Sequence, residues 1–565
     1  MEAWRVTMSV ASEIAKLGQE FWDWRRLQQP RSHDDIPRIE RPKGWTPHWS
    51  KDDVARYRSD VRAFLEHFEG IDAGSATSPK VDVESYVEYR LIGSAIHRAL
   101  WELDHIRIWQ EQPRFYIDQS IGVLFDHLLP LEVTEAALRE VSLILAETPR
   151  ILAEGRENLE GHAIKAYAEV AIELLQKIEP QIREVISHLL PKASSDLGAE
   201  LTDRSEKAIS AFVTYREWLV GSKDSMAPIK AIGREMYQWF FDNIALVPYS
   251  PEEMRAVGFI EWERAVTLES LSRNKHRKKP VTPLPQSADE QVANEKRAEA
   301  SVREFYEGEG ILSQPETLKH YLNAPIPPYL IPIRWLGVTD DLTGPSRVDE
   351  DGYSYVPTPH ADLPYFYIAN ARDTRAGIVH EGAHYQQLAI SWRHPRVLRR
   401  HYYDSGSNEG IAFYNEELML AAGLFDDAPH SQTLMYNFMK LRAMRVIVDV
   451  NLAIGEIDIP TATAYLEKKV PMDHGTAYDE AVFFASSPGQ ALTYQIGKTQ
   501  IIKFYSDAIE KFREEFTIKG FHDYLWLNGN VPISLQRLEY LGDASDLVAI
   551  DERRSRAGST SKGSK

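Results

Sequence analysis

The 565-residue sequence contains no cysteine. Disulfides, thiolate metal ligands and a cysteine nucleophile are therefore excluded, and a metal ion would need histidine, aspartate or glutamate ligands. Long apolar runs are missing too, since none approaches the length of a membrane span. Glu2, Arg5 and Glu13 interrupt the apolar residues of the N-terminus, unlike the apolar core of a secretory signal. We expect a cytoplasmic protein with no membrane partner.

Basic residues are fewer than acidic residues in this sequence. The 65 lysines and arginines are outnumbered by 84 aspartates and glutamates, which gives a formal net charge of -19. This balance argues against a nucleic-acid partner and against an anionic membrane surface. The hydrophobic content of 43% is typical of a folded protein with a large core, and it leaves the oligomeric state unknown.

Apolar residues recur at helical spacing over most of the chain, which predicts a mostly α fold. The predicted amphipathic helices cover residues 85–110, 133–150, 163–190 (divided near Pro180), 205–245, 251–272 and 290–307. A basic and proline-rich stretch at 273–295 predicts an exposed linker loop. We expect an N-terminal helical lobe at 1–272, a C-terminal catalytic lobe at 296–552, a deep active-site cleft between them, and a disordered tail at 553–565.

Residues 326–370 are rich in proline and turn residues, and they contain two β-favouring runs, Tyr353 to Val356 and Tyr365 to Ile368. We predict a small β-sheet here. It would lie next to the segment that follows, where an edge strand could pair with an extended peptide.

The most informative segment runs from Gly377 to His384 and contains the pattern H-E-x-x-H. On a helix, His380 and His384 lie one turn apart on the same face and can bind one zinc ion. Glu381 would then sit beside the metal, able to take a proton from the water that the metal activates. The pattern also arises by chance in helices that bind no metal.

A catalytic zinc site needs a third protein ligand and one open position. Glu409 is the best candidate, because it begins a second helical segment that can fold back on the first. Asp404, Glu416 and Glu417 are competing carboxylates. Glu416 shares a helical face with Glu409 and could orient a ligand imidazole through its free N–H.

Several motifs occur in the order found in one known family. Residues 409–416 read E-G-I-A-F-Y-N-E, Arg445 and Asp449 form R-x-x-x-D, residues 488–497 read P-G-Q-A-L-T-Y-Q-I-G, and Phe521, His522 and Asp523 are followed by Gly529 and Pro532. With these motifs the chain resembles the bacterial DUF885 family, itself similar to helical zinc peptidases. This chain departs from the family in its compact H-E-x-x-H spacing, in Ile411 and in Ala453. The compact spacing favours zinc binding. The departures at Ile411 and Ala453 leave the identity of the substrate undetermined.

The resemblance implies that Tyr494 stabilises the oxyanion of the reaction opposite the metal, with His474 and His522 as weaker candidates for that role. Arg445 either binds a substrate carboxylate or forms a salt bridge with Asp449 at i+4, and we favour the salt bridge. Gln490 and Lys498 are further pocket candidates.

The sequence thus predicts a zinc-dependent hydrolase that cleaves a peptide or another amide bond, with Zn²⁺ as its cofactor. Two alternatives stay open. The protein could be a metalloenzyme for a non-peptide metabolite, because a metal centre fixes the chemistry better than the substrate. It could also be a non-catalytic relative that binds peptides.

Overall fold

The computed structural model describes residues 9–32, 39–337, 339–470 and 472–562. The predicted mostly α fold with a small sheet is confirmed. In the first half, the longer helices are α1 (Val10–Gln28), α2 (Lys51–Gly70), α3 (Val83–Leu100), α7 (Glu135–Leu159), α8 (Lys165–Leu174), α9 (Ile178–Leu189), α10 (Ser195–Ser222), α11 (Arg234–Phe240) and α12 (Pro251–His276). In the second half they are α13 (Ala288–Gly308), α14 (Tyr365–Arg372), α16 (Ala383–Ser391), α18 (Ser405–Ala422), α19 (Pro429–Ile454), α20 (Ile459–Lys469), α21 (His474–Ser486), α22 (Thr493–Phe512), α23 (Ile518–Leu527), α24 (Ile533–Leu541) and α25 (Ser545–Lys562).

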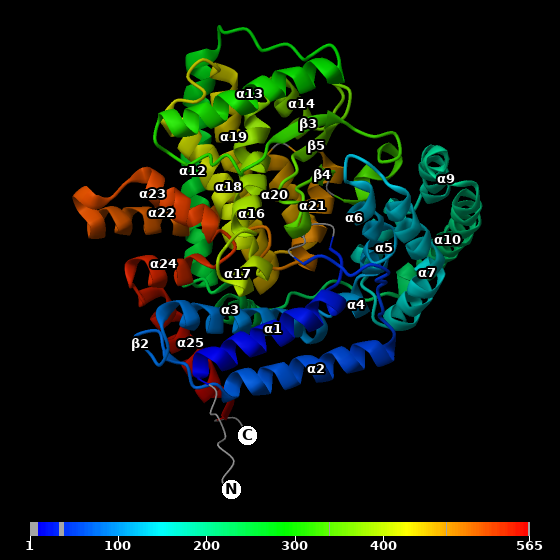
Figure 1. Cartoon of the computed structure of the whole chain (residues 1–565), viewed down its shortest axis with the longest axis horizontal. Helices are drawn as coiled ribbons and strands as arrows, with labels where there is room; N and C mark the ends of the chain where they lie inside the picture. Colours follow the sequence, from blue (N-terminus) through cyan, green and yellow to red (C-terminus); the bar gives the residue numbers. More distant parts are fainter. Residues whose placement is uncertain (1–8, 33–38, 338, 471, 563–565) are drawn as a thin grey trace.

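The centre of the molecule is built around α19, which packs along α12 and also contacts α18 (Figure 1). Helices α1, α2 and α3 contact one another and cross beneath this bundle, while α7, α9 and α10 form a separate group at its side (Figure 1). The largest buried apolar cluster draws on both ends of the chain, from Phe21 in α1 to Ile550 in α25. None of the described helices is both long and apolar enough to cross a bilayer.

Some predicted boundaries were wrong. The predicted division of 163–190 is nevertheless confirmed, because α8 ends at Leu174 and Pro180 lies in the first turn of α9, where its missing N–H costs no hydrogen bond. The loop expected at 273–295 is shorter, because α12 continues to His276 and α13 begins at Ala288. The tail expected to be disordered from 553 belongs to α25 as far as Lys562, while 563–565 lie outside the described residues. Arg553 fixes this helix by pairing with Asp242 at 2.6 Å.

The small sheet has the strand order β3-β5-β4. β3 (Tyr321–Pro325) runs parallel to β5 (Gly352–Val356), and β4 (Asp340–Asp341) pairs antiparallel with β5. A second, two-stranded sheet joins β1 (Gly74–Ser75) to β2 (Ser78–Pro79). The predicted strand Tyr353 to Val356 is therefore present, whereas β3 precedes the predicted range.

The second predicted strand, Tyr365 to Ile368, is instead the first turn of α14. Successive residues of a strand point to opposite faces, so two neighbouring aromatic rings could not pack on one partner. In the helix, Tyr365 and Phe366 both contact Phe438 of α19, with ring centroids 6.1 and 5.0 Å away. Packing on α19 thus outweighs the β preference of these residues.

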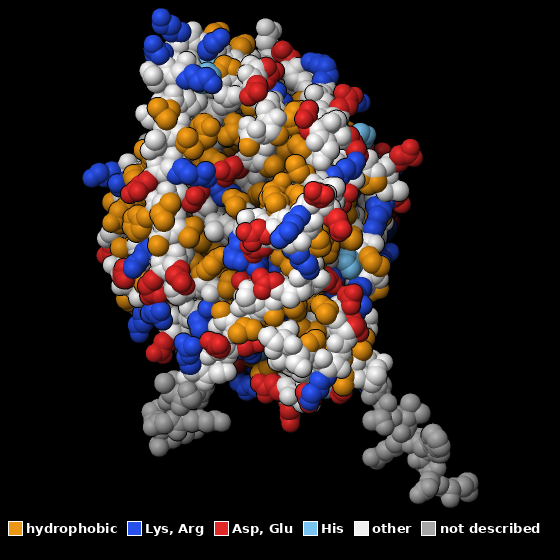
Figure 2. Space-filling model, turned by 90° about the vertical axis from the view of Figure 1, so that its left-hand side faces the viewer, with side chains coloured by type: hydrophobic (Ala, Val, Ile, Leu, Met, Phe, Trp, Pro, Cys, Tyr) orange, Lys and Arg blue, Asp and Glu red, His pale blue; other side chains and the backbone are white. Residues whose placement is uncertain are grey.

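Charged side chains of both signs are interspersed over the face drawn in Figure 2, with apolar side chains gathered between them. Separate patches of opposite sign would instead give an extended field that attracts a highly charged polymer. The absence of a nucleic-acid partner stays a prediction.

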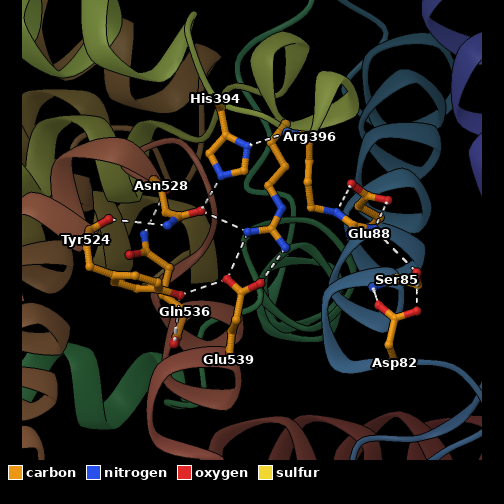
Figure 3. A network of polar contacts seen from close by, with 10 residues as sticks. Asp82, Ser85, Glu88, His394, Arg396, Tyr524, Asn528, Gln536 and Glu539 are labelled. Atoms are coloured by element: carbon orange, nitrogen blue, oxygen red, sulfur yellow. Dashed lines mark hydrogen bonds and ion pairs between the residues drawn. The ribbon is translucent and has the colours of Figure 1, made fainter.

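A polar network fixes the segment between α16 and α18 (Figure 3). Arg396 pairs with Glu88 of α3 at 2.6 Å, and Arg399 pairs with Glu539 of α24 at 2.6 Å. His394 Nδ1 accepts from the Arg396 backbone N–H, which leaves Nε2 as the donor to Asn528 at 3.1 Å. Because this segment joins two helices of the candidate site, the network also fixes their relative position.

Candidate metal centre

The H-E-x-x-H residues lie where a π-helical turn, Ile378–Gly382, leads into α16. Such turns are frequent at functional sites and disturb the regular backbone ladder. Asn415 of α18 donates its side-chain N–H to the Val379 carbonyl at 2.8 Å. The sheet packs on the helix that follows this turn, since the Tyr321 ring of β3 stacks on Tyr385 of α16 at 5.8 Å.

Three side chains converge at this turn. The ligand atoms of His380, His384 and Glu409 all lie within 4.8 Å of one another. Glu409 Oε2 is 3.6 Å from His380 Nε2 and 3.3 Å from His384 Nε2. Two ligands about 2.1 Å from a tetrahedral zinc ion would be about 3.4 Å apart, which is close to both distances.

The polar atoms at this point also fit a metal site. Glu409 Oε2 is buried, and the Nε2 atoms of both imidazoles lie close to it. A buried carboxylate needs a positive charge beside it, which a protonated imidazole or a divalent cation between the three groups would supply. The three residues could therefore hold a divalent metal ion.

Glycines explain how Glu409 reaches this position. Its helix, α18, begins at the N-cap Asp404, whose side chain accepts from Ser407 N–H. A Cβ atom at Gly410 would lie 2.8 Å from the Gly497 backbone of α22, and one at Gly497 would lie 2.0 Å from the Gly406 carbonyl oxygen. The two helices thus touch backbone to backbone, which only glycine permits.

Tyr494 lies one turn before Gly497 and is brought to the site by this contact. Its ring stacks on His380 at a centroid distance of 6.2 Å and an interplanar angle of 10°. Its hydroxyl makes a hydrogen bond to the Glu409 carboxylate. The phenol therefore lies beside the three converging ligand atoms.

Glu416 contacts His380 at the ring nitrogen that faces away from Glu409. Its Oε1 lies 2.7 Å from His380 Nδ1 and 2.9 Å from Arg442 Nη2. A carboxylate at Nδ1 favours the tautomer with the proton on Nδ1, so that Nε2 faces Glu409 with a free lone pair. Arg442 neutralises Glu416 and lies 5.5 Å from the Tyr494 ring.

The electrostatics of the site follow from these contacts. Burial alone would raise the pKa of Glu409, but the two imidazoles and the Tyr494 hydroxyl outweigh it and lower the pKa to about 2. Burial alone would lower the pKa of His384, but Glu409 outweighs it and raises the pKa to about 9. Both pKa shifts favour a proton on His384 next to an ionised Glu409. A divalent cation bound between the two residues would take the place of that proton.

Glu381 faces a second acidic group. Burial, and then the charge of Glu381, raise the pKa of Asp340 in β4 to about 7. Tyr321 donates its hydroxyl to Asp340 Oδ1 at 3.0 Å. The sheet thus supplies a carboxyl group that tends to hold a proton beside the glutamate of the motif.

The other predicted site residues have different partners. Arg445 pairs with Glu480 of α21 at 2.7 Å and not with Asp449, which is buried and accepts from Tyr237, Gly489 and Leu492. Lys498 is fully buried against Glu417 and Glu261, which removes Glu417 as a candidate ligand. Gln490 donates to Ser405 at 2.8 Å.

The two histidines proposed as weaker oxyanion donors make other contacts. His522 is fully buried between the Ile311 carbonyl and the Tyr414 hydroxyl, and burial lowers its pKa to about 4. His474 lies at the exposed start of α21, where it contacts Glu467 at 2.9 Å. His522 is therefore a core residue, and His474 contacts solvent.

Comparison with known proteins identifies the family. The model of the family described as "Bacterial protein of unknown function (DUF885)" matches residues 40–538. The chain belongs to the DUF885 family. No curated protein sequence matches this DUF885 chain.

Two solved structures share its fold. One is a candidate lipoprotein of unknown function from Shewanella oneidensis, with a TM-score of 0.69 and 16% identity over 95% of this chain and 100% of that one. The other is a candidate lipoprotein from Colwellia psychrerythraea, with a TM-score of 0.69 and 14% identity over 97% and 99%. At such low identity the likeness concerns the fold of the DUF885 chain alone.

Proposed function

We propose that this DUF885 protein is a zinc-dependent hydrolase that cleaves a peptide or another amide bond. The observation that carries the proposal is the convergence of His380, His384 and Glu409, whose ligand atoms lie within 4.8 Å of one another. Bound there, a zinc ion would act as a Lewis acid that polarises the substrate carbonyl and acidifies water.

The residues around this point have complementary roles in the proposal. Glu381 takes the proton of the attacking water on its carboxylate and passes it to the nitrogen of the leaving amine. Tyr494 donates its hydroxyl to the oxygen that becomes negative during the attack. Glu416 and Arg442 hold His380 in the required tautomer.

We further propose that the substrate reaches these residues through a cleft between two helical lobes, as the sequence suggested. In this proposal an extended peptide would pair with an edge of the small sheet, whose outer strands are β3 and β4. The cytoplasmic location also stays a prediction, which cell fractionation of the native host would test.

The substitution Glu381→Gln tests the proposed chemistry. It should leave the bound zinc in place, because Glu381 is not among the converging ligand atoms. Turnover of a cleavable peptide from a randomised library should fall by about 10²-fold or more, since an amide cannot act as a general base. Zinc content and cleavage, read by mass spectrometry, check the two expectations.

A matched control is Glu467→Gln, which alters a glutamate that contacts the exposed His474. Its turnover should equal that of the unaltered protein. Normal turnover by Glu381→Gln would reject the assigned role. If the zinc-loaded protein cleaves metabolite amides but no peptide, the substrate is a non-peptide compound, and if it cleaves neither, the non-catalytic alternative holds.

A further inference from the structure

The ring of Tyr494 contacts two guanidinium groups as well as an imidazole. Arg442 and Arg445 lie one turn apart in α19, and their Cζ atoms are 5.5 and 5.3 Å from the centroid of this ring. The ring of His380 stacks on the same ring at 6.2 Å. A cation within about 6 Å of an aromatic ring is attracted by its π-system. Tyr494 therefore contacts a candidate metal ligand and two positive charges.

The two arginines differ in their carboxylate partners. Arg442 Nη2 lies 2.9 Å from Glu416, the residue that also contacts His380 Nδ1. A substitution of Arg442 would therefore disturb a candidate zinc ligand at the same time. Arg445 pairs instead with Glu480 of α21, so its effect on Tyr494 can be separated from the orientation of His380.

The ion pair between Arg445 and Glu480 is bidentate. Arg445 Nη2 and Nε donate to the two carboxylate oxygens of Glu480 at 2.7 and 3.0 Å, and the two side chains are only 17% and 21% exposed. Two parallel hydrogen bonds fix the plane of a guanidinium group. A partly buried cation also interacts with a ring more strongly than an exposed one. Glu480 thus fixes the position of the charge that faces Tyr494.

The attachment of α21 to α19 does not depend on this ion pair alone. Ala477, Ala481 and Phe484 of α21 share a buried apolar cluster with Met444 and Val448 of α19. Apolar burial is the main source of stability at such a contact. The ion pair is therefore available for a role at the ring of Tyr494.

We infer that Arg445, fixed by Glu480, is a positioning residue for Tyr494. It holds the ring in place, and its positive charge makes the phenol a stronger hydrogen-bond donor to the oxygen that becomes negative during the attack. The inference rests on the proposed function, in which Tyr494 donates to that oxygen. Because this negative charge develops only during the attack, Arg445 should affect kcat and leave KM unchanged.

Arg445→Met tests the inference, because it removes the charge and keeps an unbranched side chain. With the zinc-loaded full chain and a peptide that it cleaves, kcat should fall about tenfold, while KM and zinc content should stay unchanged. Arg445→Lys keeps a positive charge and should restore kcat to within about threefold. Glu480→Gln, which releases the guanidinium, should also lower kcat and gives a second test should Arg445→Met fold poorly.

The matched control is Arg56→Met in α2. Arg56 also pairs with a carboxylate, that of Asp53, and lies 5.2 Å from the ring of Tyr57, so the same kind of contact is lost away from the site. Its kcat should equal that of the unaltered protein. A loss of kcat in Arg445→Met that Arg445→Lys does not restore would overturn the inference and assign the ion pair to the packing of α21.

Fluorine NMR gives a readout that needs neither zinc nor substrate. 3-Fluorotyrosine incorporated at position 494 alone reports on the charge next to the ring in the metal-free full chain. Arg445→Met should shift this signal and Arg56→Met should not, so an unchanged signal in Arg445→Met would overturn the inference. A shifted signal with normal kcat in Arg445→Met would overturn the inference alone. If the zinc-loaded unaltered protein cleaves no substrate, the proposed function falls together with the inference.

Discussion

At the scale of single residues, the orientation of His380 depends on a chain of charges that reaches it from two other helices. Glu416 of α18 lies 2.7 Å from its Nδ1, and Arg442 of α19 lies 2.9 Å from the same carboxylate oxygen. Both partners are buried. An uncompensated charge there would be costly, so the three residues stabilise the site only as a unit.

Asp449 gives a prediction on pH. It is fully buried, and burial raises its pKa in the folded protein to about 6, compared with about 3.9 in an unfolded chain. The folded protein therefore holds this proton more tightly, so the contribution to stability is complete below pH 4 and is lost as the pH rises to 6. The free energy of unfolding should fall by about 3 kcal/mol over this window relative to Asp449→Asn. Urea unfolding of both proteins at pH 4 and pH 7 measures the difference, and parallel pH curves would contradict it.

The sequence could predict the residues whose roles depend on local spacing. His380 and His384 are one helical turn apart, and Glu409 and Glu416 share a helical face, so a helix suffices to relate each pair. Arg442 and Asp340 gave no such signal, because α19 and β4 bring them to the site from distant parts of the chain. The predicted salt bridge between Asp449 and Arg445 was wrong for the same reason. The actual hydrogen-bond partners of Asp449 come from distant parts of the chain, in α11 and in the segment before α22.

At the scale of elements, the crossing of α18 and α22 positions both Glu409 and Tyr494. Gly497→Ala would place a Cβ atom 2.0 Å from the Gly406 carbonyl oxygen, so the helices must separate. We expect a loss of about 1–3 kcal/mol in unfolding free energy and a loss of zinc affinity, because Glu409 moves with α18. Thermal unfolding and zinc titration measure the two effects.

The matched control for this crossing is Gly198→Ala in α10. The nearest atom to its new Cβ would be 3.5 Å away, in the Leu190 side chain, which is an ordinary contact. Alanine is a better helix former than glycine, so stability should rise by about 0.5–1 kcal/mol. Equal effects of the two substitutions would show that the close crossing has no special importance.

The elements that the sequence mispredicted are those that tertiary packing decides. Helix α14 forms from a β-favouring run because two of its rings pack on α19. Helix α25 continues through the expected tail because Arg553 pairs with Asp242. Neither of these tertiary contacts can be predicted from the conformational preferences of the residues or from the hydrophobic periodicity of the sequence.

At the scale of the whole molecule, helices from both halves of the chain share one large buried cluster. The polar network around Arg396 and Arg399 likewise connects α3, the segment after α16 and α24. The sequence predicted the mostly α class, because helical spacing recurs throughout the chain, but it could not predict which helices pack together. The candidate metal centre thus lies on a scaffold to which described helices from both halves of the chain contribute.

The zinc content of the protein tests the account most directly. After incubation with zinc and dialysis, elemental analysis should find one ion per chain in the unaltered protein and much less in Glu409→Ala, while Glu467→Ala should match the unaltered protein. Binding at the three converging side chains predicts this pattern, because removal of one ligand of a tetrahedral site greatly weakens the binding of the metal. A zinc content that is unchanged by Glu409→Ala, or an unaltered protein that retains no zinc, would contradict the central claim.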